Sequence, residues 1–238
     1  MISSHQPTIF GKDIIAALSS KEDGNMKLGM GDDEAVRRNR RLFLKNNGLE
    51  PEDTTLVAVT YATDDFAKYR IATAREKSSG MENSEGIIAA DALVADQPGH
   101  ALFLPIADCV GAILYDEAHH ALMVSHLGRH SVEIDGALKS VDFLVRHYKT
   151  DPSMLKVWLS PAAGNATYPL HAFNGKSLHE VAESQLIDAG VKKENIENAN
   201  IDTATGDDYY SHSQHLKGLD EPGRFAIVAM MRGQGEPA

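Results

Sequence analysis

The stretch "ALFLPIADCVGAILYDEAHHALMVSHLG" at residues 101–128 contains three apolar runs separated by short breaks. The runs cover 101–106, 111–115 and 121–125, and a fourth run at 92–94 precedes them. Strands this close together are usually joined by hairpins, so we expect a sheet that is mixed and largely antiparallel. The pair "HH" at 119–120 falls between two of the runs and is expected in a solvated hairpin turn.

The flanking segments add helices and further strands. The segment 32–48, "DDEAVRRNRRLFLKNNG", has helical periodicity, with Asp32 or Asp33 as the N-cap and Gly48 at its end. A polar loop is expected at 75–86. Apolar periodicity also predicts strands at 14–18, 55–61, 67–73, 155–161 and 223–231, and helices at 134–148 and 176–190. Because strands and helices do not alternate strictly, we expect an α+β fold with helices layered on the sheet.

Whole-chain properties limit the class of protein. The 238 residues, 42% of them hydrophobic, contain no repeat and no long linker, so a single domain over 1–238 is expected. The net charge of −11 opposes binding to nucleic acid or to anionic membranes, and no run approaches the roughly 18 apolar residues that cross a bilayer. One cysteine and the absence of a signal-like N-terminal stretch favour a cytoplasmic protein. A small anionic substrate can still occupy a local basic pocket.

Cys109 and His126 are the first candidates for a functional site. Each lies at the end of an apolar run, Cys109 before "VGAILY" and His126 after "ALMVS", where neighbouring strands can bring them together at one rim of a sheet. A thiol and an imidazole in contact form either a nucleophile and its base or two of zinc's preferred ligands. A buried, unreactive cysteine is the alternative that these two residues leave open.

Several blocks of the sequence resemble one known family. "ADALVADQPG" (90–99), "ADC" (107–109) and "HLG" (126–128) are similar to signature blocks of the multicopper polyphenol oxidase or laccase-like family, whose members are now regarded as purine nucleoside phosphorylases. The resemblance extends over about residues 14–231. It includes a "GDD" leading into a helix that carries Val36, Asn39 and Arg40, and the C-terminal block 207–231. It implies a monomer with an α-β-β-α arrangement of helices around a mixed sheet.

The resemblance also implies a zinc ion held by two histidines and one cysteine. Cys109 and His126 match two of these ligands. The third histidine should align near "VTYAT" (59–63), where this chain has Tyr61, and no histidine lies between His5 and His100. A tyrosine is a poor ligand near pH 7, so we expect zinc to bind weakly or not at all, with Tyr61 pointing into the same cleft.

The activity that the resemblance implies is phosphorolysis of adenosine, inosine or methylthioadenosine, with phosphate as co-substrate and deamination of adenosine as a second activity of the family. Phosphorolysis needs a cationic cradle for phosphate and a proton donor for the departing base. Arg40, Arg129 and Arg224 are the predicted phosphate-facing groups, and Asp108 is predicted to orient an imidazole or a sugar hydroxyl. Arg40 and Arg224 can equally tie helix and strand ends together. His130 is a further imidazole beside His126.

Two other functions remain open. In the first, a metal-free Cys109 acts as the nucleophile of an amidase or deamidase, with His126 as its base. In the second, the chain is a degenerate family member that binds a nucleoside or a protein partner without turnover. Base preference, phosphorolysis versus deamination, and the biological pathway depend on the shape of the pocket and are not predicted.

Overall fold

Ten strands form two sheets in the computed structural model, which describes residues 3–85 and 87–233. In order across the first sheet, the strands are β1 (Ile14–Leu18), β10 (Phe225–Met231), β5 (Ala101–Ile106) and β2 (Thr54–Leu56). In the second sheet they are β3 (Tyr69–Ile71), β4 (Ala92–Ala95), β7 (Ala121–Leu127), β6 (Val110–Asp116), β8 (Lys156–Leu159) and β9 (Ile196–Asn198). The pairs β2–β5, β3–β4 and β8–β9 are parallel and the other pairs are antiparallel. The expected mixed, largely antiparallel arrangement is confirmed.

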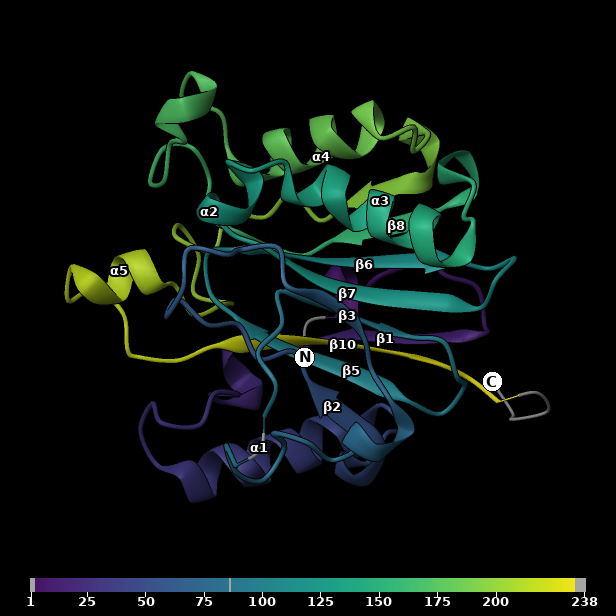
Figure 1. Cartoon of the computed structure of the whole chain (residues 1–238). Coiled ribbons are helices and arrows are strands. Elements are labelled where there is room, and N and C mark those ends of the chain that lie inside the picture. The colour runs from purple at the N-terminus through teal and green to yellow at the C-terminus, as the bar shows by residue number, and fades with distance from the viewer. Residues whose placement is uncertain (1–2, 86, 234–238) are drawn as a thin grey trace.

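Helices cover the outer faces of both sheets, which gives four layers in the order α-β-β-α (Figure 1). The helices are α1 (Asp33–Asn46), α2 (Arg129–Val132), α3 (Gly136–Tyr148), α4 (Leu178–Asp188) and α5 (His212–Leu216). Helix α1 lies against the first sheet, whereas α3 and α4 lie against the second. Asp32 caps α1 by accepting a hydrogen bond from the Glu34 backbone N–H, and Gly48, with φ of 70°, follows the helix as predicted.

Three apolar cores separate the layers, and strand alternation explains all three. In β10, Ile227 and Ala229 point into the core between the sheets, whereas Ala226 and Val228 point toward Phe43 of α1. The third core lies between the second sheet and α2, α3 and α4. Because successive side chains of a strand face opposite sides, a strand that is apolar throughout belongs in a sheet covered on both faces.

The pairing of the central strands differs from the prediction. Of the four apolar runs at 92–125, only β6 and β7 pair as a hairpin; β5 and β6 are consecutive in sequence but belong to different sheets. The turn at 107–109 therefore carries the chain from one sheet to the other. The strand expected at 55–61 ends at Leu56, and β9 and α5 were not predicted. Gly86 of the predicted polar loop lies outside the described residues.

No helix within residues 3–85 and 87–233 combines the length and the apolar character that crossing a bilayer requires.

The two sheets approach each other closely at Gly111 of β6. A β-carbon at this position would lie 2.6 Å from Cδ1 of Ile227 and 2.9 Å from Cδ1 of Ile106, both in the first sheet. We expect Gly111→Ala to lower the free energy of unfolding by about 1–3 kcal/mol, because a well-packed core resists an added methyl group. Urea denaturation measures the change. Gly206→Ala is the control, since nothing lies within 4 Å of its β-carbon position; equal stability of the two variants would contradict the expectation.

Candidate functional site

Cys109 lies at the turn between the two sheets, and the residue before it has an unusual backbone. Asp108 adopts the left-handed region, with φ of 67°. Its Oδ1 accepts a hydrogen bond from Thr203 Oγ1 (2.8 Å) and its Oδ2 accepts one from the Ser213 backbone N–H (2.6 Å). Both oxygens are therefore used to hold the turn and the start of α5. Among the described residues these oxygens bond no imidazole, so the bonds that the structure shows for Asp108 hold the turn; its predicted role toward a sugar hydroxyl stays a prediction.

The structure brings Cys109 and His126 together. His126 lies on β7 opposite Gly111 of β6, so its strand runs directly beside the one that Cys109 precedes. A β-carbon at Gly128 would lie 3.1 Å from Cys109 Sγ and 3.2 Å from His126 Nε2, so both side chains contact the same small volume. Only glycine leaves room for them there, which explains the glycine of "HLG".

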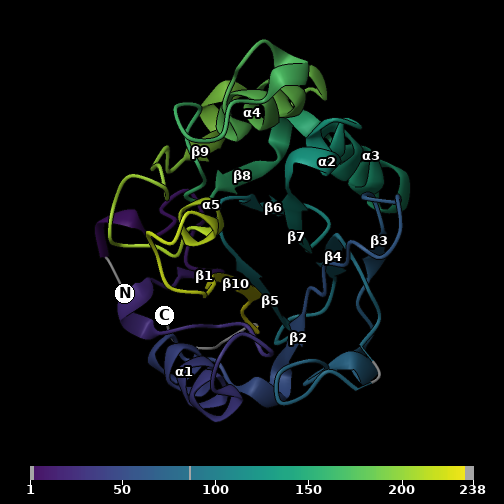
Figure 2. The same ribbon diagram turned by 90° about the vertical axis from the view of Figure 1, so that its left-hand side faces the viewer.

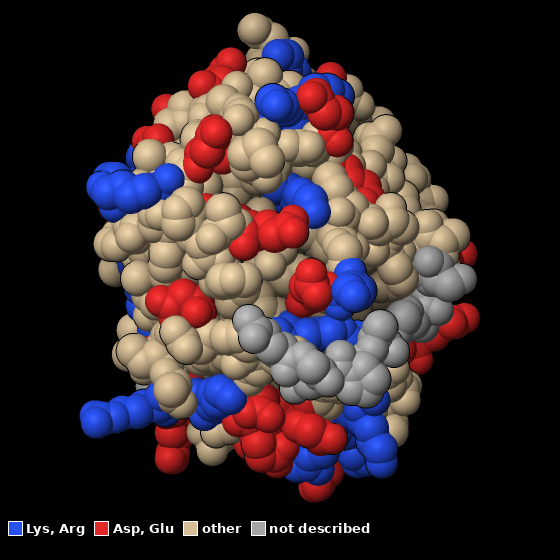
Figure 3. Space-filling model, turned by 90° about the vertical axis from the view of Figure 1, so that its right-hand side faces the viewer, with Lys and Arg blue, Asp and Glu red and all other residues tan. Residues whose placement is uncertain are grey.

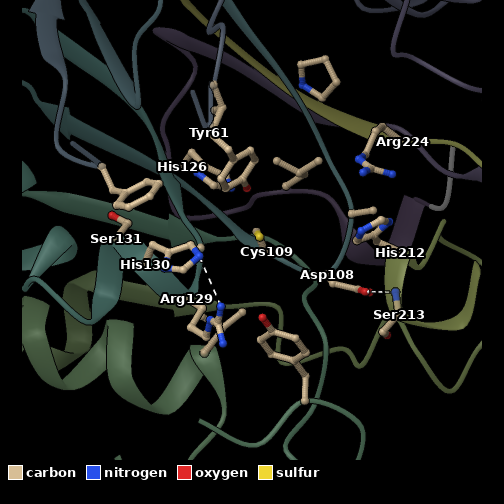
Figure 4. Close-up of a pocket in the computed structure, with 18 of the residues that line it drawn as sticks. Tyr61, Asp108, Cys109, His126, Arg129, His130, Ser131, His212, Ser213 and Arg224 are labelled. Carbon is tan, nitrogen blue, oxygen red and sulfur yellow. Dashed lines mark hydrogen bonds between the residues drawn. The ribbon is translucent and has the colours of Figure 1, made fainter. Parts of the chain in front are cut away.

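Both side chains line a cavity of about 440 Å³, a volume typical of small-molecule sites. Figure 4 shows Tyr61 and His130 on one side of it and Arg224 and His212 on another. The rings of Phe66 and His130 stack, with centroids 4.6 Å apart and planes inclined by 17°, and Tyr61 meets His130 edge-on. These three rings, hereafter the aromatic wall, line one side of the cavity with aromatic faces and edges of the kind against which a nucleobase packs.

Cationic side chains converge on the same cavity. Lys27, Arg129 and Arg224 line it, and none of the three forms an ion pair with a carboxylate among the described residues. Burial, together with the neighbouring cations Arg224 and Arg40, lowers the pKa of Lys27. Because these cations repel one another, an anion bound between them would relieve the repulsion.

The cavity and the face shown in Figure 3 lie on opposite sides of the molecule. Helices α2 and α5, which contribute residues to the cavity, lie on the face presented in Figure 2. On the opposite face, Figure 3 shows basic and acidic side chains interspersed. That mixture of charges differs from the cavity, where Lys27, Arg129 and Arg224 have no carboxylate partner among the described residues.

Arg40 does not line this cavity, which contradicts its predicted place beside the substrate. The side chain is 2% exposed; Nε donates to the Met26 carbonyl, and Nη1 donates to the carbonyls of Gly80 and Met81, each at 2.8 Å. Burial lowers its pKa to about 10, and its guanidinium lies over the Phe103 ring. Arg40 thus ties α1 to two loops, which is the structural alternative left open for it.

The electrostatic surroundings keep Cys109 and His126 uncharged near pH 7. Burial and the Asp108 carboxylate raise the pKa of the Cys109 thiol to about 12, against smaller opposing effects of Arg224 and a hydrogen bond with Tyr61. Burial and the Lys27 cation lower the pKa of His126 to about 4. A thiolate–imidazolium pair, the reactive form of a cysteine nucleophile, is disfavoured in these surroundings. This weighs against the amidase alternative.

Tyr61 reaches the site as predicted, with its hydroxyl directed toward Cys109 (Figure 4). The residue as a whole is 62% exposed, yet burial of its hydroxyl and the nearby Cys109 raise the pKa of Tyr61, so the phenol stays protonated. No group of three or more His, Cys, Asp or Glu side chains within the described parts of the chain is placed to hold a metal ion. Two donors and a neutral phenol do not fit the three protein ligands of a catalytic zinc site.

The sequence analysis did not identify several residues that line the cavity, among them Lys27, Phe66, Asp91 and His212. Lys27, Phe66 and His212 come from loops or from the first turn of a short helix, where no periodicity distinguishes them. Asp91 has a weak signal, because it is the acidic residue that opens the apolar block 92–95. Lys27 and His212 are 185 residues apart in sequence, and only the folded chain brings them together.

Comparisons with known proteins agree with the fold. The family model described as multi-copper polyphenol oxidoreductase laccase matches residues 17–174 and 174–232. A purine nucleoside phosphorylase from Bacteroides thetaiotaomicron is 32% identical over 95 residues; the match covers 40% of this chain and 34% of that relative, about a third of its length.

Solved structures show the same arrangement of layers. The hypothetical protein YfiH of Bacillus licheniformis superposes with a TM-score of 0.82 at 20% identity, covering 92% of this chain and 93% of its own. YlmD of Geobacillus stearothermophilus gives the same TM-score and identity and covers 93% of each chain. Because the sequence identity is only 20%, these superpositions show a shared fold and nothing about function.

We expect the wild-type protein to bind zinc weakly and Tyr61→His to bind it at least tenfold more tightly, because the imidazole supplies the third ligand. Titration with zinc against a competing chelator measures both affinities. His130→Ala is the control for an unintended ligand from α2. Tight stoichiometric zinc in wild type and in His130→Ala would contradict the expectation.

We expect Cys109 to resist alkylation in the folded protein. With a pKa of about 12 instead of the usual 8.5, its thiolate fraction near pH 8 is lower by roughly three orders of magnitude. Since the chain has one cysteine, mass spectrometry after iodoacetamide treatment reports on this site alone. The urea-denatured chain is the reference, and equal rates for folded and denatured protein would show that the thiol is not protected.

Proposed function

Because the chain belongs to the multi-copper polyphenol oxidoreductase laccase family, we propose that it binds a purine nucleoside and inorganic phosphate in this cavity and cleaves the glycosidic bond by phosphorolysis. The observation that carries the proposal is that Lys27 and Arg224, which have no carboxylate partner among the described residues, line the same cavity as the aromatic wall, with Arg129 beside His130 of that wall. Cations that lack carboxylate partners attract phosphate, and aromatic rings bind a purine base by stacking. The curated relative from Bacteroides, named a purine nucleoside phosphorylase, supports the same class of substrate.

The reaction needs little from the protein beyond binding and charge. A phosphate oxygen attacks C1′ of the ribose, the bond from C1′ to the base breaks, and its electron pair leaves with the base. The proton of hydrogen phosphate balances the reaction, because formation of the sugar phosphate releases it and the base takes it up. Lys27 and Arg224 hold the anion and the aromatic wall orients the base. The neutral side chains of Cys109 and His126, hereafter the floor of the cavity, lie between the cations and the aromatic wall.

Binding without turnover is the second candidate. The observation that favours it is the floor of the cavity, where an uncharged thiol and an uncharged imidazole stand with Tyr61 in place of a third metal ligand. Such a protein would bind nucleosides with micromolar or weaker affinity and release no free base. Chromatographic assay of base and sugar phosphate, alongside calorimetric binding, distinguishes the two candidates.

Arg224→Gln should raise the KM for phosphate by about tenfold or more, because a charge-assisted contact to phosphate contributes roughly 1.5–3 kcal/mol. The assay follows release of hypoxanthine from inosine at varied phosphate. Arg146→Gln, on the exposed side of α3, removes the same charge far from the cavity and is the control. An unchanged KM in Arg224→Gln would contradict the assignment of the phosphate site, and absence of turnover in wild type would favour the binding protein.

A further inference from the structure

Asp91 is a buried carboxylate that lines the cavity and that the proposed reaction does not use. It lies directly before β4 and is 1% exposed. Its backbone carbonyl accepts a hydrogen bond from the His126 N–H (2.8 Å), which places it beside the floor of the cavity. A carboxylate at such a position costs free energy unless its oxygens are bound by donors. The partners of its two oxygens therefore indicate its role.

One carboxylate oxygen of Asp91 holds the loop that carries Tyr61 and Phe66, two of the three rings of the aromatic wall. Oδ2 accepts a hydrogen bond from the Lys68 backbone N–H (3.0 Å) and lies 3.9 Å from Lys68 Nζ. The Asp91 backbone N–H in turn donates to the Lys68 carbonyl (2.9 Å). Tyr61 and Phe66 precede Lys68 by only a few residues, so these bonds fix the base of their loop.

The other oxygen, Oδ1, has no hydrogen-bond partner within residues 3–85 and 87–233. Asp108 is the other carboxylate that lines the cavity, and both of its oxygens are taken by Thr203 and Ser213. Asp91, which lines the cavity, therefore has one carboxylate oxygen that accepts no hydrogen bond from the described residues. A ligand that fills it must bring a hydrogen-bond donor.

We propose that Asp91 reads an N–H group on the purine base, so that the site selects bases carrying a donor on the six-membered ring, such as the N1–H of inosine or the 6-amino group of adenosine. The inference rests on the proposed function. The base is assigned to Asp91 because Tyr61 and Phe66, two of the three rings of the aromatic wall, belong to the loop that Asp91 holds. Phosphate is repelled by a carboxylate and is attracted instead to Lys27 and Arg224.

Asp91→Asn tests this role without releasing the loop. The amide oxygen of Asn can still accept from the Lys68 N–H, which directs the NH₂ group toward the cavity and replaces an acceptor by a donor. Calorimetry measures the affinity for inosine, for adenosine and for purine riboside, whose base has no N–H donor. Asp116→Asn, at the far end of β6, is the matched control for loss of a buried carboxylate.

Wild type and Asp116→Asn should bind inosine and adenosine at least about tenfold more tightly than purine riboside, and Asp91→Asn should abolish this preference. An unchanged preference in Asp91→Asn overturns the inference, as does an equal loss of affinity for all three ligands, which a purely structural role predicts. Selective loss of the preference for inosine over 2′-deoxyinosine would assign Asp91 to the ribose and also overturns it. Wild type that binds no nucleoside overturns the proposed function itself.

Discussion

The site depends on the way Asp108 is held in its turn. This residue has a left-handed backbone, which is unfavourable for a residue with a side chain, and its carboxylate is fastened by Thr203 and by the first turn of α5. The turn passes the chain from β5 in one sheet to β6 in the other, so Cys109 emerges between the sheets. The stacking of the sheets, the place of α5 and the floor of the cavity all depend on this one crossing.

Much of the fold could be predicted because apolar runs of strand length are dense between 92 and 127, and the helices carry caps and amphipathic periodicity. Which strand belongs to which sheet could not be predicted from the sequence. β5 and β6 are apolar on both faces, so their sequences fit a hairpin as well as a crossing, and only packing at Gly111 and the bonds of Asp108 distinguish the two. Elements as short as β9 and α5 carry too few residues to show a period.

The site was predictable in part, for a related reason. Cys109 and His126 lie at the ends of recognisable strands, whereas Lys27 and Phe66 lie in irregular segments and His212 begins the short helix α5, all far from Cys109 in sequence. Arg40, in contrast, was predicted at the site but does not line the cavity. An arginine in a family block suggested phosphate, but its neighbours are three backbone carbonyls in a buried place, where a guanidinium contributes as a multiple donor.

The position of β10 has a consequence for how the chain reaches its native state on the ribosome. This strand is the last in the described sequence, yet it lies in the interior of the first sheet between β1 and β5. Until it has been synthesised, β1 lacks its neighbour, and the apolar core over α1 stays open. Arg224, next to the start of β10, also arrives late. The growing chain therefore cannot assemble its binding cavity early, and its exposed β1 and β5 edges are the parts that a chaperone would protect.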